Sequence, residues 1–579
     1  MRFWRINLVL FFLTSFGLLL MAKLFLIQVR DYDYWKALAQ GQQIFFAETE
    51  GERGGIFLEN QTDGFKLIPL AINKDWEFVF VSPREILKEG GDFGGVAREL
   101  GRILKEDENA ISEKIEKGEE EERLHVLIKN KLSEEEVNLL KEAKLPGVHL
   151  ERESVRYYPQ EEFASQVIGF LGGDKNGQYG IEGHFNDILQ GKTGVRGGEK
   201  SAWGYFFQTG SSSIEKGTDL VLTLDYNIQF MAEQLLKEAK ESLDIEGGQI
   251  IVGDPRDGKI LAMADFPSFD PNHYTKESDL AIFKNSSVQK IFEPGSVFKP
   301  ITMVAGLDTK KITPQTKYID EGIVKIGGYK ILNYGQRTWG ERTMSEVLEK
   351  SINTGAVFVE RQVGHQTFLN YLEKFGFFEP TGITLQGEVY SSNLNFKKGY
   401  EINFATASFG QGIEITPLQL FRAFSALANG GKSTKPYIVK KNIKNGEEIL
   451  TQPEISQNPI ASREAIDQLT AMMVNVVEEG YGKAAKVPGY YVAGKTGTAQ
   501  VPFTSLGIEK SGYSDKTWQT FIGFAPAFNP KFVILVKLDN PKARTAEYSA
   551  APIFGKLARY IIDLQKIPPD RIEEGVEEK

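Results

Sequence analysis

The segment Phe292–Pro300 reads Phe-Glu-Pro-Gly-Ser-Val-Phe-Lys-Pro and leads into an apolar run over residues 301–307. Pro300 cannot donate a hydrogen bond to the carbonyl four residues earlier, so it fits only in a first helical turn, and a helix must begin close to Ser296. Ser296 and Lys299 then share a face, where a desolvated lysine can take the hydroxyl proton in place of a histidine. Because the start of a helix also favours negative charge, the segment predicts a serine nucleophile with a lysine base.

The same Ser-x-x-Lys spacing occurs at two other places. Ser213 and Lys216 lie in a Gly/Ser-rich linker with no apolar run after it, and Ser287 and Lys290 lie in a polar stretch with no comparable helix behind it. So short a pattern also arises by coincidence on a protein surface. Context therefore favours Ser296 over the other two serines.

A Ser-x-Asn pattern, Ser351 and Asn353, follows a predicted helical stretch over residues 344–350 and precedes the apolar run 356–359. A hydroxyl and an amide on such a helix–helix connection can relay protons and hold a substrate amide. The alternative is a helix N-cap, a common role for serine and asparagine. The same pattern recurs at Ser391 and Asn393.

A Lys-Thr-Gly pattern follows the predicted strand Tyr490–Gly494 and consists of Lys495, Thr496 and Gly497, with Thr498 next. Gly494 and Gly497 are expected to let a ligand backbone approach an edge strand closely, so that an extended peptide can pair there.

Two further roles are expected around this pattern. Lys495 and Thr498 would face a terminal carboxylate, and the main-chain amides of Ser296 and Thr498 would converge as an oxyanion hole. The second Lys-Thr-Gly, residues 192–194, precedes the serine in a linker and is interpreted as a turn.

The order of the three patterns resembles that of the penicillin-binding transpeptidases and serine β-lactamases. Further matching stretches are Ser-Phe-Gly-Gln-Gly at 408–412, Thr-Pro-Leu-Gln-Leu at 416–420 and Gly-Phe-Ala-Pro at 523–526. The resemblance covers most of residues 217–560.

In residues 217–560 the predicted order of elements is strands first, then helices, then strands again. Strands are expected at 219–224, 249–252, 260–263, 519–524 and 532–538, with helices at 226–242 and 463–479 between them. This order is typical of a sheet completed by distant parts of the chain, with helices on its faces. The fold class is thus α+β, and the resemblance implies an antiparallel sheet with helices on both faces.

The region before residue 217 is mixed, with a predicted strand at 78–81 and helical stretches at 95–117 and 133–144. Its short motifs at 53–56, 156–159, 168–170 and 180–182 resemble the extended mixed α/β pedestal of class B penicillin-binding proteins. Leu58-Glu59 replaces the usual Asp-Arg pair of that family and Gln166 a common histidine, so local pedestal contacts are expected to differ. Arg53 and Glu182 are interpreted as structural residues. No segment resembles a glycosyltransferase domain.

The N-terminus carries an apolar stretch over residues 6–29, long enough to span a bilayer as a helix. No small-x-small cleavage site follows, so an uncleaved anchor is expected. Arg2 and Arg5 precede the stretch, and Trp4 and Trp35 flank it, which places the N-terminus in the cytoplasm by the positive-inside rule. A buried core helix is the alternative.

The expected organisation is therefore a cytoplasmic tail (1–5), a transmembrane anchor (6–29), a pedestal (30–216), a transpeptidase domain (217–566) and a disordered acidic tail (567–579).

The amino-acid composition argues against several classes of function and of site. The net charge of -10 argues against nucleic-acid binding, and the absence of cysteine excludes disulfides, thiolate nucleophiles and cysteine metal sites. With 5 histidines, a histidine metal cluster is not expected.

The resemblance implies a membrane-anchored D,D-transpeptidase of the bacterial plasma membrane that needs no cofactor. Ser296 would attack the penultimate D-Ala of a peptidoglycan stem peptide and expel the last D-Ala, with Lys299 as base and Ser351 as proton relay. Asn353, Lys495, Thr496, Gly497 and Thr498 would contact substrate, and β-lactams would acylate Ser296.

The sequences of the motifs at 408–412 and 416–420 and the chain length favour a septal, division-type enzyme. Such an enzyme would work with a membrane glycan polymerase of the SEDS type and with divisome proteins. An elongation-type enzyme is the alternative. Two other classes stay open: a β-lactam-sensing receptor, and a β-lactamase or D,D-carboxypeptidase.

Overall fold

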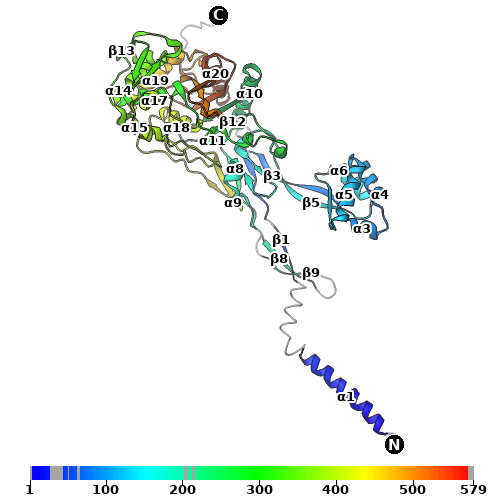
Figure 1. Ribbon diagram of the computed structural model, residues 1–579. Helices are drawn as coiled ribbons and strands as arrows, with labels where there is room; N and C mark the ends of the chain where they lie inside the picture. Colours follow the sequence, from blue (N-terminus) through cyan, green and yellow to red (C-terminus); the bar gives the residue numbers. More distant parts are fainter. Residues whose placement is uncertain are drawn as a thin grey trace. The chain divides into compact units, whose positions relative to one another are not determined.

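The structure, a computed structural model, describes residues 3–26, 44–49, 51–60, 66–192, 194–200, 206–211 and 215–571 (Figure 1). The chain forms two compact units. One consists of Met1–Gly54 with Ile188–Thr218, and the other of Gly55–Asp187 with Asp219–Lys579.

The first unit contains the N-terminal helix α1 (Phe3–Phe25) and a three-stranded antiparallel sheet. The strands are β1 (Ile44–Thr49), β8 (Gly194–Lys200) and β9 (Phe206–Ser211). Helix α1 has exposed apolar side chains along its length, and residues 7–25 are long and apolar enough to cross a membrane. Residues 27–29 of the expected anchor, Arg2 and Trp35 lie outside the described residues.

The second unit begins with a sheet ordered β18-β17-β10-β2-β3-β4, in which β5 also pairs with β3. Its strands are β2 (Ile56–Asn60), β3 (Lys66–Val81), β4 (Val126–Lys129), β5 (Val148–Tyr157), β10 (Asp219–Leu222), β17 (Val439–Lys444) and β18 (Glu447–Leu450). Strand β10, just before the catalytic part, pairs with β2 of the pedestal on one side and with β17 on the other.

A small helical layer packs on the far ends of β3, β4 and β5. Its helices are α3 (Pro83–Lys88), α4 (Phe93–Leu104), α5 (Glu108–Glu120) and α6 (Glu134–Ala143). The single helical stretch expected over 95–117 is wrong, because Lys105 is left-handed with φ 57° and Asp107 caps a new helix. The stretch expected at 133–144 is confirmed as α6, which Ser133 begins with a capping box.

Short elements connect this part to the rest. They are α7 (Ser165–Ile168), β6 (Phe170–Leu171), β7 (Gly177–Gln178), α8 (Gly180–His184), α9 (Asn186–Leu189), η2 (Pro271–Lys276) and η3 (Leu280–Phe283). Glu182 is fully buried and accepts a hydrogen bond from Arg156 at 2.7 Å. Gln166, in the place of the histidine common in the family, donates to Pro267 O at 2.8 Å and to Ile282 O at 3.1 Å. Glu59 pairs with Lys440 and Lys441 of β17.

The central sheet is antiparallel, in the order β12-β11-β21-β20-β19. Its strands are β11 (Gly247–Gly253), β12 (Ile260–Phe266), β19 (Ala493–Pro502), β20 (Tyr513–Ala525) and β21 (Phe532–Asp539). The expected completion of one sheet by distant segments is confirmed, since β11 pairs with β21. The strand expected over 490–494 begins only at Ala493, so the Lys-Thr-Gly pattern lies inside β19 and not after its end.

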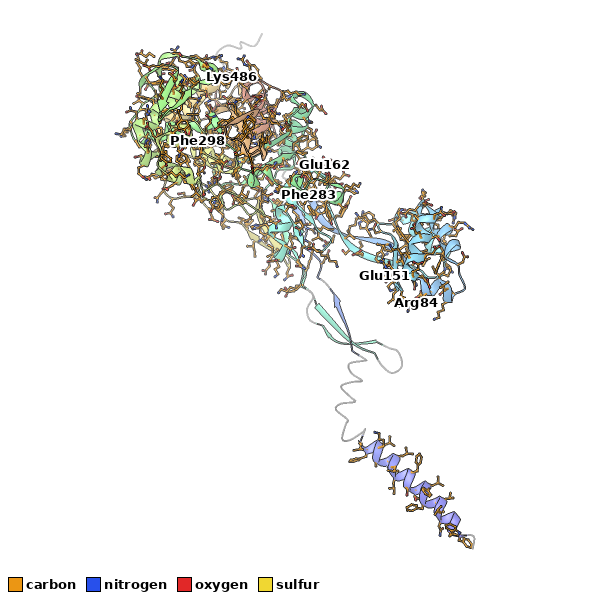
Figure 2. All side chains as sticks on the ribbon, in the orientation of Figure 1. Arg84, Glu151, Glu162, Phe283, Phe298 and Lys486 are labelled. Carbon is orange, nitrogen blue, oxygen red and sulfur yellow. The ribbon has the colours of Figure 1, made fainter. Side chains whose placement is uncertain are left out.

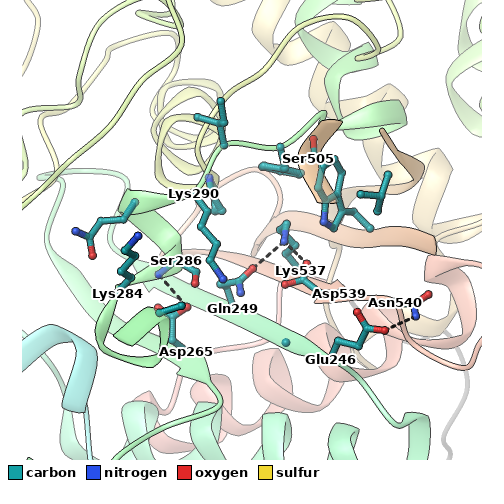
Figure 3. A pocket seen from close by; sticks show the side chains of 18 of the residues that line it. Glu246, Gln249, Asp265, Lys284, Ser286, Lys290, Ser505, Lys537, Asp539 and Asn540 are labelled. Atoms are coloured by element: carbon teal, nitrogen blue, oxygen red, sulfur yellow. Dashed lines mark hydrogen bonds and ion pairs between the residues drawn. The ribbon is translucent and has the colours of Figure 1, made fainter. Parts of the chain in front are cut away.

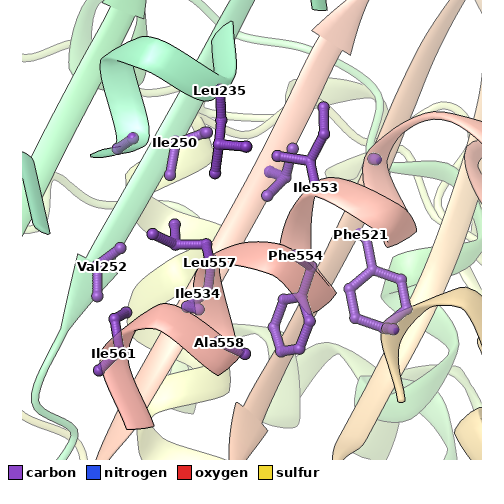
Figure 4. Close-up of a cluster of buried hydrophobic side chains, with 14 of the residues drawn as sticks. Leu235, Ile250, Val252, Phe521, Ile534, Ile553, Phe554, Leu557, Ala558 and Ile561 are labelled. Carbon is purple, nitrogen blue, oxygen red and sulfur yellow. The ribbon is translucent and has the colours of Figure 1, made fainter. Parts of the chain in front are cut away.

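One face of this sheet is covered by α10 (Tyr226–Leu243) and α20 (Ala550–Gln565). Their apolar side chains form a fully buried cluster with Ile250, Phe521 and Ile534 of the strands (Figure 4). Burial of so many large apolar groups stabilises the packing of these two helices on the sheet behind the site.

The other face carries the helical part of the domain. Its helices are α11 (Ser286–Gln289), α12 (Lys299–Asp308), α13 (Met344–Glu349), α14 (Asn353–Val363), α15 (His365–Lys374), α16 (Leu394–Lys397), α17 (Glu401–Ala407), α18 (Pro417–Ala428) and α19 (Arg463–Glu478). Hairpin strands are β13 (Lys317–Asp320), β14 (Ile323–Ile326), β15 (Tyr329–Leu332) and β16 (Gly340–Thr343). The 3-10 turns are η4 (Gly295–Phe298), η5 (Tyr334–Gln336), η6 (Lys483–Ala485), η7 (Phe503–Leu506) and η8 (Ala546–Tyr548).

The expectation of a disordered tail from residue 567 is wrong for its first five residues. Tyr490 Oη donates to Ile567 O at 2.5 Å, Tyr491 N donates to Asp570 at 2.9 Å, and Arg571 pairs with Glu478 at 3.1 Å. Residues 572–579 lie outside the described residues.

Candidate active site

Ser296 lies in η4, directly before α12. Pro300 stands in the first turn of that helix, as expected. Gly295 has φ 61°, and its N–H donates to Gly410 O at 2.9 Å. Thr302 Oγ1 donates to Ser408 O at 2.7 Å. Both contacts lead to the Ser-Phe-Gly-Gln-Gly stretch, which therefore supports the turn from behind.

Phe298 anchors the turn from its other side. Figure 2 labels this residue within the helical part of the domain. Its ring is fully buried, and its centroid lies 5.1 Å from that of the Phe377 ring. The turn is thus fixed by packing while Ser296 itself stays partly exposed.

Lys299 is the centre of a converging set of polar atoms. Its ammonium nitrogen is fully buried and lies 3.0 Å from Ser296 Oγ, 3.0 Å from Ser351 Oγ, 2.6 Å from Ser351 O and 2.8 Å from Asn353 Oδ1. A neutral amine has two N–H groups, and these match the carbonyl of Ser351 and the amide oxygen of Asn353, which can only accept. The lone pair is then left for a hydroxyl proton.

The electrostatics favour that neutral form. Burial lowers the pKa of Lys299 well below its ordinary value, and the positive charge of Lys495 lowers it further. Burial also lowers the pKa of Lys495, to about 7. Desolvation penalises the charged form of an amine, so a lysine in this position can act as a base near neutral pH.

Ser351 lies between α13 and α14 with φ 56°, a left-handed conformation that is uncommon for serine. The N-cap of α14 is Ile352, so the interpretation of Ser351 as a helix N-cap is wrong. The strained backbone directs both the carbonyl and the hydroxyl of Ser351 to Lys299. Strain of this kind costs about 1–3 kcal/mol and is typical of functional sites.

Lys495 comes from the edge strand β19 and is also fully buried. Its ammonium donates to Ser351 Oγ at 3.0 Å and to Thr496 O at 3.0 Å. Side chains alternate along a strand, so Thr496 and Thr498 leave β19 on the face opposite Lys495. Thr498 Oγ1 accepts from Ala546 N at 3.0 Å.

Both glycines of β19 have a packing role inside the protein that the sequence did not predict. A Cβ at Gly494 would meet the Phe521 ring at 2.6 Å, and one at Gly497 would meet Pro294 O and Val297 at 3.0 Å. Gly494 therefore admits a core side chain, and Gly497 admits the turn that carries Ser296. The second contact brings the turn and β19 together.

These residues border a cavity of about 660 Å³. Of the predicted site residues, those that line it are Ser296, Ser351, Asn353, Thr496 and Thr498, while Lys299, Lys495 and Gly497 lie behind its wall. Further lining residues include Tyr334, Arg337, Trp339, Tyr481, Asp515, Arg544, Glu547 and Tyr548.

The competing matches do not converge on this cavity. Ser287 is buried, its hydroxyl has no hydrogen-bond partner among the described residues, and Lys290 is exposed. Asn393 binds the main chain of Ser391 and Glu414. Lys192 pairs with Glu215 at 3.0 Å. Ser213 and Thr193 lie outside the described residues.

Sequence reasoning missed a buried network behind Asn353. Asn333 Oδ1 accepts from Asn353 N at 3.0 Å and from Thr354 N at 3.2 Å. Asn333 Nδ2 donates to both carboxylate oxygens of Asp320, which also accepts from Thr354 Oγ1 at 2.6 Å. Nothing near Asn333 in the sequence distinguishes it, because its partners come from separate elements.

Sequence reasoning also missed Glu293 as a site residue, although it lies within the segment Phe292–Pro300. It is buried, and it accepts from Gly412 N at 3.1 Å and from Tyr513 Oη at 3.0 Å. Burial raises its pKa to about 7. The carboxyl thus joins the turn of Ser296 to two segments that border the cavity.

In the described part of the chain, no group of three or more His, Asp or Glu is placed to hold a metal ion.

Comparisons with known proteins agree with this geometry. Residues 248–559 match the family model of the penicillin-binding protein transpeptidase domain, and residues 49–222 match that of the penicillin-binding protein dimerisation domain. Stage V sporulation protein D of Bacillus subtilis is 32% identical over 522 residues, covering 88% of this chain and 78% of that protein. Peptidoglycan D,D-transpeptidase FtsI of Escherichia coli is 27% identical, covering 88% and 84%. The crystal structure of penicillin-binding protein 3 of Mycobacterium tuberculosis, complexed with aztreonam, superposes with a TM-score of 0.68 at 25% identity, covering 91% of this chain and 98% of that one.

Proposed function

Because this chain belongs to the class B penicillin-binding proteins and is a serine-type peptidoglycan D,D-transpeptidase, we propose that Ser296 is its acylated residue. The observation that carries this proposal is the contact of Ser296 Oγ with the buried Lys299 Nζ at 3.0 Å. Among the described serines with a lysine three residues on, Ser296 is the one whose lysine is buried beside it.

In the first half-reaction, Ser296 Oγ attacks the carbonyl carbon of the penultimate D-Ala of a stem peptide. The hydroxyl proton passes to the lone pair of Lys299, and a C–O bond forms. The tetrahedral intermediate then collapses, the C–N bond to the last D-Ala breaks, and the leaving nitrogen receives a proton. Ser351 relays that proton, since its hydroxyl contacts the ammonium nitrogens of both Lys299 and Lys495.

In the second half-reaction, the amine of a neighbouring stem peptide attacks the ester carbonyl. The amine loses a proton to Lys299, the ester C–O bond breaks, and Ser296 Oγ regains its proton. The product is a crosslinked peptide and the enzyme returns to its starting state. The second step needs a water-poor site, because water would otherwise resolve the ester.

Substrate contacts are assigned to Asn353, Lys495, Thr496, Gly497 and Thr498. A peptide paired along the edge strand β19 would place its terminal carboxylate near the Lys-Thr-Gly-Thr segment, where positive charge is available from Lys495. The main-chain N–H groups of Ser296 and Thr498 are the proposed oxyanion hole. The close packing of Gly497 against the Ser296 turn supports this pairing.

The domain organisation and membrane topology belong to the same proposal. Residues 1–5 form a cytoplasmic tail, 6–29 cross the plasma membrane, 30–216 form the pedestal and 217–566 the extracytoplasmic transpeptidase domain. The two family matches and the apolar helix α1 support this division.

We assign the enzyme to septal wall synthesis, with a membrane glycan polymerase of the SEDS type and divisome proteins as partners. The similarity to FtsI of Escherichia coli supports this choice, and another relative is named as a sporulation protein. Depleting the protein in its source cells tests the assignment. Division-type function predicts filaments that fail to divide, whereas loss of shape with continued division would favour an elongation-type role.

Mass spectrometry of the full-length protein after exposure to a β-lactam tests the nucleophile. We expect a stable adduct on Ser296 that is absent from Ser296→Ala and retained in Ser287→Ala, the control with the same local spacing. No adduct on Ser296 would contradict the assignment. An adduct lost within minutes would favour a β-lactamase, and a stable adduct without crosslinking of stem peptides would favour a β-lactam-sensing receptor.

A further inference from the structure

A second and larger cavity, of about 900 Å³, lies over the central sheet (Figure 3). Its floor includes Asp265 of β12, Gln249 of β11 and Lys537 of β21. We call it the Asp265 cavity. It shares no lining residue with the cavity that holds Ser296.

The floor is a row of buried polar residues that crosses the three neighbouring strands β12, β11 and β21. Asp265 pairs with Gln249 and Gln249 with Lys537 across adjacent antiparallel strands, so their side chains share a face. The exposed fractions of these three residues are 7%, 1% and 5%. The next row on the same face is fully buried and apolar, with Ile251, Leu535 and Ile522. Burying a row of polar groups in such a setting costs free energy unless these groups form hydrogen bonds.

The row is only partly satisfied by the protein. Lys537 donates to Gln249 Oε1 at 3.0 Å and also contacts Asp539. Asp265 Oδ1 accepts from Ser286 N at 3.2 Å, but Asp265 Oδ2 is buried and has no hydrogen-bond partner among the described residues. Burial raises the pKa of Asp265 to about 7. A buried carboxyl with an open acceptor position is suited to an added hydrogen-bond donor.

The rim carries charges of both signs: Lys284, Lys290 and Lys516 line it, and so do Glu246, Asp279 and Glu414. Lys284 and Lys290 line the cavity, both are exposed, and neither forms an ion pair with a described residue (Figure 3). Phe292 and Trp518 add apolar wall, with their rings 5.9 Å apart. A guest that fits carries an amino group for Asp265, a carboxylate for the two rim lysines and an amide between them. The volume is of the size that holds drug-sized ligands, about 300–1,000 Å³, and exceeds the need of a single amino acid.

We propose that the Asp265 cavity is a second peptide-binding site, which takes a short peptide bearing both a free amino group and a free carboxylate. Resting on the proposed function, its occupant is a second peptidoglycan stem peptide. Asp265 and Gln249 bind its side-chain amino group and the adjacent amide, and Lys284 with Lys290 binds the carboxylate.

The test uses the full-length protein in detergent micelles with Ser296 first acylated completely by a β-lactam, as checked by mass spectrometry, so that the catalytic site is blocked. A synthetic stem pentapeptide with a free side-chain amine and a free C-terminus is then titrated by calorimetry. We expect one binding event to remain. Acetylating the amine or amidating the C-terminus should each weaken it about tenfold or more, as for loss of a charge-assisted hydrogen bond.

Variants assign the two ends. The double variant Lys284→Ala, Lys290→Ala should weaken binding of the free-acid peptide about tenfold and leave binding of the amidated peptide unchanged. Asp265→Asn should weaken binding of the free amine and not of its acetylated form. Lys276→Ala, an exposed lysine outside the cavity, is the matched control.

Absence of binding to the acylated protein, or binding equal in the double variant and the wild type, would overturn the second site. Failure of the proposed function is distinguishable from this result, because it would already appear as a missing adduct on Ser296 in the first step.

Discussion

Lys299 and Lys495 meet at one hydroxyl group: the ammonium nitrogen of each lies 3.0 Å from Ser351 Oγ. Both lysines are fully buried, and two positive charges this close in a desolvated site repel each other. One of the two is therefore neutral in the resting enzyme. If Lys299 is the base, it is the neutral lysine of the pair. Lys495 then keeps its proton and donates a hydrogen bond to Ser351.

Replacing Ser351 should separate its chemistry from its backbone strain. Ser351→Ala and Ser351→Gly both remove the relay, so acylation by a β-lactam should fall about 10²–10⁴-fold in each. Glycine accepts φ 56° without penalty, so the glycine variant should be more stable than the alanine variant by about 1 kcal/mol. Stopped-flow acylation and thermal unfolding measure the two effects. Equal acylation in Ser351→Ala and the wild type would contradict the relay.

The acylation rate should rise with pH as Lys299 loses its proton. Burial lowers the pKa of Lys299 first, and the charge of Lys495 lowers it further. Lys495→Met removes that second contribution, so the acidic limb of the pH profile should shift to higher pH. The measurement is the second-order rate of acylation across the neutral range in both proteins. An unshifted profile would show that the two lysines are not coupled as described.

Glu293 should make the protein less stable as the pH rises. Burial raises its pKa from 4.5 to about 7, so the folded state binds the proton more tightly than the unfolded state. The stability present below pH 4.5 is then lost as the pH rises through 7. The effect is on the order of 3 kcal/mol at most, at 1.36 kcal/mol per unit.

Glu293→Gln keeps an acceptor for Gly412 and gains a donor for Tyr513, so it should remove that pH dependence. The unfolding midpoint should fall less between mildly acidic and mildly alkaline buffer in Glu293→Gln than in the wild type. Tyr513→Phe is the companion variant, because it removes the hydroxyl partner and leaves the carboxyl in place. Identical slopes in Glu293→Gln and the wild type would place the titration elsewhere.

Asn333 should act as a positioning residue for Asn353. Asn333→Ala leaves the N–H groups of Asn353 and Thr354 and part of Asp320 without partners, at a cost of about 1–3 kcal/mol for each buried group. We expect lower stability and an acidic limb of the acylation profile displaced toward lower pH, because the ammonium form of Lys299 loses the acceptor Asn353 Oδ1. Asn458→Ala, on the exposed surface, is the control. A loss of stability with an unchanged pH profile would limit Asn333 to a structural role.

Much of the fold was accessible from local patterns. Alternating and continuous apolar runs predicted β11, β12, β20 and β21, and a proline in a first turn predicted where α12 begins. The errors came where one residue changes the local conformation. Lys105 in the left-handed region divides a helical pattern that looks continuous, and β19 begins later than its apolar run, after the bridge between Val487 and Tyr490.

The sequence by itself determined the class of the protein and the residues that its chemistry needs, because Ser296, Lys299, Ser351, Asn353 and Lys495 stand in short patterns whose order is informative. Only the tertiary structure decided which lysine is neutral, why Gly494 and Gly497 are glycines, and which residues support the site. Those properties depend on burial and on distances between segments far apart in the chain. Asn333, Glu293 and Asp265 carry no local signal for them, since a carboxyl or an amide acquires its pKa and its partners only when other elements fold around it.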